Sequence, residues 1–209
     1  MVYIPLRSRC AIAVVRLLAV ALAGAGAACA TTAPAGGSEA RPARNLVAAD
    51  LYPLDVGWKW AYDVQKDGQS MLALYAVLER TAGAALVQAG EENLTYAVSA
   101  EGVAQKDGPV VGDFVIKNPI QVGAEWPVVG GRARIAAVAQ SVTVTAGKFD
   151  DCVVVEARRT DPARVVRTTF APGTGPVIIE LQIQVAGELT TVTRATLRAV
   201  TKPGQDPLG

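Results

Sequence analysis

The stretch Val177-Ile178-Ile179-Glu180-Leu181-Gln182-Ile183-Gln184-Val185 decides the fold class of this chain. Its apolar residues alternate with Glu and Gln, and a period of two is typical of a strand with one buried face. Ala186-Gly187 then supplies a turn, and the Thr- and Val-rich segment Leu189–Val200 predicts a returning strand. These residues therefore predict an antiparallel hairpin.

The same period recurs along residues 46–201. In Trp58–Val64 the aromatic residues fall on one face, and turn residues and a second candidate strand, Met71–Leu78, follow. Ala85–Ala89 and Leu94–Ser99 predict another hairpin around Gly90–Asn93. Candidate strands recur every 8–12 residues or so, with no helical stripe and no connection long enough for a parallel crossover. The sequence predicts an all-β antiparallel meander that forms a curved sheet or an open β-barrel.

The first 28 residues predict a cleaved signal peptide. Arg7, Arg9 and Arg16 give a positive beginning, and Leu17–Ala25 is a short apolar run. A bilayer span needs about 20 apolar residues, so this run is too short to be one. Small residues follow at once, as signal peptidases require.

Cys29 predicts a lipid anchor. Gly26-Ala27-Ala28-Cys29 is similar to a bacterial lipobox, in which the cysteine is acylated and becomes the first residue. The alternative is ordinary cleavage after Ala28 or Ala30, which leaves the protein periplasmic or secreted. Because the residue after the cysteine is Ala rather than Asp, we expect the outer membrane, with the protein facing the periplasm.

Three further segments complete the expected organisation. Residues 29–45 are small, polar and rich in Pro and Gly, which predicts a flexible tether. Residues 46–201 form the β domain, with enough length for one core. Residues 202–209 predict a flexible tail.

The residue inventory restricts the chemistry. The chain has no histidine, which excludes Ser-His-Asp catalysis and His-ligated metal sites. Cys152 is the one cysteine of the predicted domain, so it forms no disulfide there. From Cys29 onward, 17 basic and 19 acidic residues give a net charge of −2, without the basic excess that nucleic-acid binding requires. We therefore expect no enzyme, cofactor, metal site or nucleic-acid partner.

Four groups of residues each allow a functional and a structural interpretation. Cys152 begins a β-branched run beside two aspartates that oppose a thiolate, which favours a buried structural thiol. Asp150-Asp151 suits a carboxylate pair or a turn, and the turn is favoured. Pro172–Pro176 predicts a hairpin turn rather than a phosphate loop. A solvated hairpin face, rather than an anion site, is favoured for four arginines: Arg158, Arg159, Arg164 and Arg167.

The aromatic residues Trp58, Trp60 and Tyr62 are the candidate ligand-binding residues. They share one strand face, where they either fill the core or line a pocket. Trp126 is a further candidate packing anchor.

Three motifs resemble a group of uncharacterised proteobacterial envelope lipoproteins. Tyr52–Tyr62 matches its Y-P-L-x-x-G-x-x-W-x-Y opening, Val144–Val155 its V-x-A-G-x-F-x-x-C-x-x-V block, and Phe170–Val177 resembles its Y-A-P-G-x-G-x-V turn. The resemblance implies a curved antiparallel sheet similar to that of open-barrel lipoprotein carriers. It brings no activity and no site residue.

Two functions compete at this stage. The first is a non-enzymatic envelope lipoprotein that binds an apolar or amphipathic ligand inside a curved sheet. The alternative is a structural or interaction module of an outer-membrane protein complex, which docks through an exposed edge strand. Leu189–Val200 is the candidate edge.

Overall fold

The computed structural model describes residues 45–107, 112–160 and 162–205. All of them belong to the unit 40–209. The predicted signal peptide, Cys29, most of the tether and residues 206–209 lie outside the described residues.

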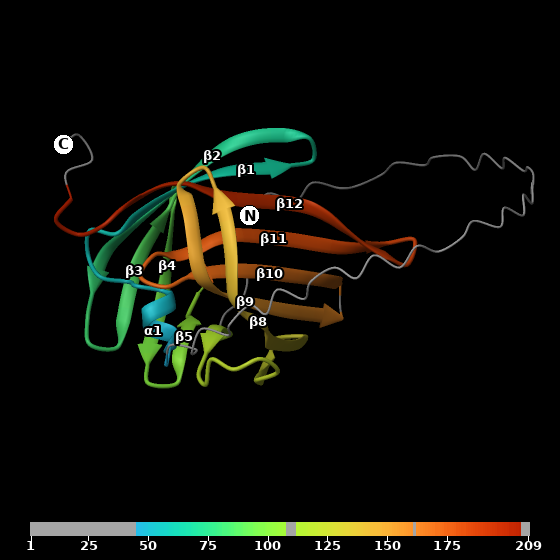
Figure 1. Ribbon diagram of the computed structural model, residues 1–209, viewed down its shortest axis with the longest axis horizontal. Coiled ribbons are helices and arrows are strands. Elements are labelled where there is room, and N and C mark those ends of the chain that lie inside the picture. Colours follow the sequence, from blue (N-terminus) through green and yellow to red (C-terminus); the bar gives the residue numbers. More distant parts are fainter. Residues whose placement is uncertain (1–44, 108–111, 161, 206–209) are drawn as a thin grey trace, which may run out of the picture. The chain divides into compact units, whose positions relative to one another are not determined.

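The described residues form twelve strands and one short helix (Figure 1). The elements are α1 Ala48–Leu51, β1 Lys59–Lys66, β2 Gln69–Arg80, β3 Ala84–Ala89, β4 Glu92–Ser99, β5 Gly102–Gln105, β6 Phe114–Lys117, β7 Glu125–Val128, β8 Gly131–Val144, β9 Gly147–Thr160, β10 Ala163–Ala171, β11 Gly175–Val185 and β12 Glu188–Thr201. The predicted hairpins around residues 66–69, 90–93 and 186–187 are all present.

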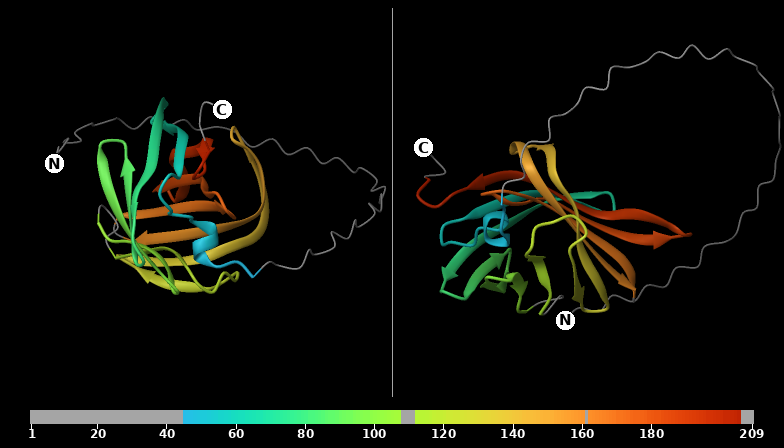
Figure 2. Two further views of the ribbon diagram at one scale, coloured as in Figure 1. Left: turned by 90° about the vertical axis from the view of Figure 1, so that its left-hand side faces the viewer. Right: turned by 60° about the horizontal axis from the view of Figure 1, so that its bottom comes forward.

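All twelve strands belong to one antiparallel sheet, in the order β6-β5-β4-β3-β2-β1-β12-β11-β10-β9-β8-β7. Each half is a meander, and the halves join where the first and last strands pair, with Lys59 opposite Thr201 and Lys66 opposite Thr193. Figure 2 shows how strongly the sheet curves. The predicted all-β antiparallel meander is confirmed.

The prediction that Leu189–Val200 forms an edge is wrong. This segment lies in β12, which pairs with β1 on one side and β11 on the other. The edges of the sheet are β6 and β7, which have four residues each. The sequence pattern of the β11–β12 hairpin could not show that β1, the first strand of the chain, pairs with the other side of β12, the last strand.

Side chains bridge the two ends of this sheet. The Trp126 indole N–H of β7 donates to the carbonyl oxygen of Phe114 in β6, at 3.0 Å. The Val129 backbone N–H donates to the Asp113 carboxylate at 2.7 Å, and the Arg159 guanidinium of β9 pairs with the same carboxylate. Contacts made by side chains therefore span the gap between β6 and β7. In a closed barrel, backbone hydrogen bonds between the two strands would take this place. We call these contacts the seam.

The core lies on the concave face, where α1 fills one end. Ala48 and Leu51 of α1 are fully buried. The backbone N–H of Ala48 donates to the Asn118 side chain at 2.9 Å, and the Gly173 N–H donates to the Asp50 carbonyl at 2.7 Å. This single helical turn thus joins the β6–β7 connection to the β10–β11 turn.

The tip of the β11–β12 hairpin projects beyond its neighbour. Pairing with β10 ends at Ile183, whereas pairing with β12 continues to Val185. As a result the last apolar residues of the alternating stretch, Ile183 and Val185, are exposed, and so is Leu189, which pairs with Gln184. The strand was predicted correctly, but its outer third buries no face because no strand or helix covers it.

Candidate functional site

The three aromatic residues of the β1 segment are all buried, and two of them make long-range hydrogen bonds. The Trp60 indole N–H donates to the Thr174 carbonyl at 2.7 Å, and the Tyr62 hydroxyl donates to the Pro176 carbonyl at 2.8 Å. Both acceptors lie at the predicted β10–β11 turn, which the structure confirms. Gly175 permits the close approach, because a Cβ there would lie 3.2 Å from the indole nitrogen and its φ is +104°.

Trp60 and Tyr62 line a hollow of about 350 Å³ on the concave face, which we call the aromatic hollow. Its walls come from β1, β2, β3, β4, β5 and β11 and from the chain just after α1. The lining residues are Tyr52, Trp60, Tyr62, Tyr75, Ala89, Glu92, Leu94, Tyr96, Gln105, Pro176 and Ile179. Glu92 is exposed and Tyr75 half-buried, so the hollow opens to solvent beside them.

Trp58 does not line the hollow. Its ring stacks on Trp60, with centroids 5.7 Å apart and planes 10° apart. The Lys202 ammonium lies 5.7 Å from the centroid of Trp58 on the domain's C-terminal side. Of the three candidate ligand-binding residues, the structure brings two to the hollow and gives the third a supporting position behind Trp60.

Sequence reasoning missed three aromatic residues of the hollow: Tyr52, Tyr75 and Tyr96. Tyr52 contacts Tyr96 edge-on at 5.5 Å between centroids, and Tyr75 contacts Tyr62 in the same way at 5.5 Å. The pairing of β1 with β2 offered one signal, since Tyr75 stands directly opposite Trp60. Tyr52 and Tyr96 come from elements that only the folded sheet brings close.

The phenols of the hollow are held in the neutral form. Burial raises the pKa values of Tyr52 and Tyr62 well above their ordinary value and raises those of Tyr75 and Tyr96 as well. The Glu92 charge adds to the rise in the pKa of Tyr75. Asp107 raises the pKa of Tyr96 in the same way. At neutral pH the hollow therefore presents uncharged aromatic rings near carboxylates.

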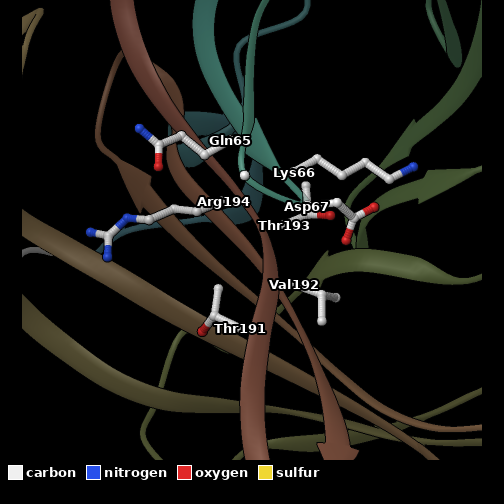
Figure 3. A pocket seen from close by; sticks show the side chains of 8 residues that line it. Gln65, Lys66, Asp67, Thr191, Val192, Thr193 and Arg194 are labelled. Carbon is white, nitrogen blue, oxygen red and sulfur yellow. The ribbon is translucent and has the colours of Figure 1, made fainter. Parts of the chain in front are cut away.

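A second hollow, of about 420 Å³, lies where the ends of β1 and β12 meet (Figure 3). Its charged side chains do not converge: Figure 3 shows Lys66 and Arg194 pointing in opposite directions. No common point is available at which these two cations could hold one ligand.

The outer face of the sheet has an apolar groove of about 580 Å³ over β1, β2 and β12, which we call the outer groove. Leu74 and Leu78 of β2 line it, and Leu72 lies two residues before Leu74 on the same strand face. These leucines are 43–56% exposed. Three exposed leucines on one strand face form an apolar surface that monomeric proteins seldom leave open to water.

Cys152 is fully buried, as predicted. Burial raises the pKa of its thiol to about 11, and the charges of Asp150 and Asp151 add to the rise. The environment therefore suppresses the thiolate that a nucleophile would need.

The prediction of a turn at Asp150-Asp151 is wrong. Both residues lie within β9, and the turn precedes them at residues 145–146. Asp151 has a φ of +56°, a left-handed conformation that Asp tolerates, and the register with β8 shifts around it. Asp150 accepts a hydrogen bond from Ser141 at 2.6 Å and pairs with Lys148 at 3.4 Å. The aspartate pair that predicted a turn marks a β-bulge instead.

The predicted solvated arginine face is wrong for Arg159. Its side chain is 7% exposed and is part of the seam. Arg158, the next residue, lies on the opposite side of β9 and pairs with Glu156 at 2.7 Å. Alternation along β9 separates the two, because one side of the strand faces the core.

Within residues 45–107, 112–160 and 162–205, no cluster of three metal-ligating side chains occurs. In the same part of the chain, no helix has the length and hydropathy to cross a membrane.

No family model and no curated protein matches this chain. Two crystal structures are similar to it. One is a proposed exported protein with a YmcC-like fold from Bacteroides fragilis, with 14% identity and a TM-score of 0.48 over 73% of this chain and 99% of that one. The other is a proposed lipoprotein from Parabacteroides distasonis, with 14% identity and a TM-score of 0.43 over 73% of this chain and 98% of that one.

Proposed function

We propose that this protein is a non-enzymatic envelope lipoprotein that holds an apolar or amphipathic ligand in the aromatic hollow. The observation that carries the proposal is the hollow itself: about 350 Å³, walled largely by aromatic and aliphatic side chains and open at one side. Small-molecule sites have this size and this lining.

The aromatic hollow is better suited to a ligand than to catalysis. Its one lining carboxylate, Glu92, is exposed, and its phenols have raised pKa values because of burial. The buried thiol of Cys152 is not among its lining residues. A binding role uses the features that are present without requiring an activated nucleophile.

The binding test uses N-phenylnaphthylamine, an apolar probe whose fluorescence rises on transfer from water. We expect saturable binding of one probe per chain. Leu94→Trp, inside the aromatic hollow, should weaken binding at least tenfold, because the larger ring occupies the space. Leu74→Trp, in the outer groove, is the matched control and should bind like the wild type.

Both variants must first show wild-type circular dichroism and urea unfolding. If Leu74→Trp abolishes binding and Leu94→Trp does not, the outer groove is the ligand site and the proposal is wrong. It is equally wrong if the wild type binds no probe.

The envelope location is proposed from Cys29, with the lipid inserted in the outer membrane and the domain in the periplasm. Palmitate labelling in intact cells tests it. We expect label in the wild type and in Cys10→Ala, and none in Cys29→Ala. Equal labelling of all three would contradict lipidation at this cysteine.

A second function, an interaction module of an outer-membrane complex, is favoured by the exposed leucines of the outer groove. A photo-crosslinking residue in place of Leu74 should form a heavier adduct in intact cells, and the same residue at Gln182 should not. Recovery of monomer alone from both positions would count against this function.

A further inference from the structure

The charged lining of the aromatic hollow is acidic. Glu92 is the formally charged residue among the lining residues, and no lysine or arginine of the described chain lines the hollow. Asp107 lies just outside, where its carboxylate accepts the Thr95 backbone N–H at 2.7 Å. A ligand carrying negative charge would meet these carboxylates, and no cation among the lining residues offsets them.

Several donors in the wall are already used within the protein. The Trp60 indole and the Tyr62 hydroxyl donate to the β10–β11 turn, at 2.7 and 2.8 Å. The Gln105 amide donates to the Asp107 carbonyl at 2.6 Å. The rest of the wall is dominated by aromatic rings, whose faces carry partial negative charge and so favour a cation over an anion.

The remaining lining is aliphatic. Leu94 of β4 and Ile179 of β11 line the same hollow as the rings. Ala89 of β3 stands between Tyr75 and Glu92, its pairing partners. One part of the hollow thus suits an alkyl segment, and the other, beside Tyr75 and Glu92, suits a positive group. The faces of aromatic rings attract a nearby cation.

From this juxtaposition we infer that the ligand of the aromatic hollow is an amphiphile with a cationic ammonium head, held between the tyrosine rings and the carboxylate of Glu92. The inference rests on the proposed function, because it names the chemical class of the ligand for the same site.

The test compares three probes with the same eight-carbon chain and different heads: octyltrimethylammonium, octyl glucoside and octyl sulfate. Isothermal titration calorimetry is run at one ionic strength and below the concentrations at which the probes self-associate. We expect octyltrimethylammonium to bind one per chain, at least tenfold more tightly than octyl glucoside. Octyl sulfate should bind more weakly than either.

Glu92→Gln should remove most of the preference for the cation and leave the affinity for octyl glucoside within about twofold. Glu91→Gln, in the turn just before Glu92, is the matched control and should keep the preference. Raising the salt concentration should weaken the binding of octyltrimethylammonium to the wild type more than to Glu92→Gln, because salt screens the charge of Glu92.

The outcomes separate the two proposals. Equal affinity for octyltrimethylammonium and octyl glucoside, or tightest binding of octyl sulfate, overturns the cationic head and leaves the amphiphile-binding function standing. A preference that survives in Glu92→Gln overturns the role of that carboxylate. If none of the three probes binds, the proposed function fails as well.

Discussion

The buried thiol and the buried phenols of this protein are kept neutral by their surroundings. Cys152 has no exposed surface, and burial and two neighbouring aspartates raise the pKa of its thiol to about 11. Tyr52 and Tyr62 stay protonated for the same main reason, desolvation of the charged form. In both places burial favours the neutral, less reactive form of the side chain.

Cys152 should therefore resist alkylation in the folded protein. We expect iodoacetamide at about pH 7.5 to leave Cys152 unmodified in the native chain and to modify it fully in guanidinium chloride, as measured by mass spectrometry of its peptide. Rapid modification of the native thiol would contradict the structure.

The raised pKa of Cys152 also predicts a pH effect on stability. Because the folded pKa lies above the unfolded value, the contribution is present below about pH 8.5 and is lost as pH rises towards 11. The free energy of unfolding should fall more steeply over this range in the wild type than in Cys152→Ala. Parallel curves would show that the thiol does not titrate differently in the two states.

At the scale of the strands, a row of alternating charges crosses the outer face of β8 to β12. Arg134, Glu156, Arg167, Glu180 and Arg194 stand opposite one another in successive strands. Three ion pairs are formed in this region: Arg134–Glu156 at 3.2 Å, Arg158–Glu156 at 2.7 Å and Arg194–Glu180 at 3.2 Å. Opposite charges at paired positions support the register of long strands.

Glu156 is the most buried carboxylate of this row, so its removal should cost the most. Burial alone would raise its pKa, but the hydrogen bonds and charges of Arg158 and Arg134 together lower it. Its contribution is therefore present at neutral pH and is lost as pH falls through the lowered value. Glu156→Gln should reduce the free energy of unfolding by about 1–2 kcal/mol at pH 7.

Urea unfolding at several pH values measures this effect. The difference between wild type and Glu156→Gln should shrink in acid, where the wild-type carboxyl becomes protonated. Glu188→Gln, at the exposed beginning of β12, is the matched control and should change stability little. A deficit that stays constant down to about pH 3 would contradict the argument.

At the scale of the whole sheet, the seam decides how far the curve closes. The strands β6 and β7 are short, and Pro127 of β7 lacks the N–H that a ladder would need. The Asp113–Arg159 pair, with both side chains less than one-tenth exposed, takes the place of that ladder. A buried ion pair that loses one charge leaves the other uncompensated.

Asp113→Asn should therefore reduce the free energy of unfolding by about 3–5 kcal/mol, because Arg159 keeps a buried charge without its partner. Amide hydrogen exchange should accelerate in β6 and β7 before the rest of the sheet. Glu101→Gln removes the exposed ion-pair partner of Lys117, which is the last residue of β6. It should reduce the free energy of unfolding by less than about 1 kcal/mol. Equal effects of the two substitutions would show that the seam is not a principal support.

The sequence by itself determined the class of structure. Alternation in stretches such as Val177–Val185, with turn residues between them, predicts strands and hairpins from contacts between chain neighbours. The sequence also shows that the chain contains no histidine. The burial of Cys152 and Trp126 followed from the same local patterns.

Only the tertiary structure decided which strands are edges and which aromatic residues share a site. The pairing of β1 with β12 joins residues more than 100 positions apart, and no period in the sequence records it. That pairing places Leu189–Val200 inside the sheet and leaves β6 and β7 as its edges. The curved sheet brings Tyr52 and Tyr96 to the hollow that Trp60 and Tyr62 line. The physical reason is that alternation fixes which face of a strand is apolar, whereas a hollow depends on how far the sheet bends and which distant strands meet across it.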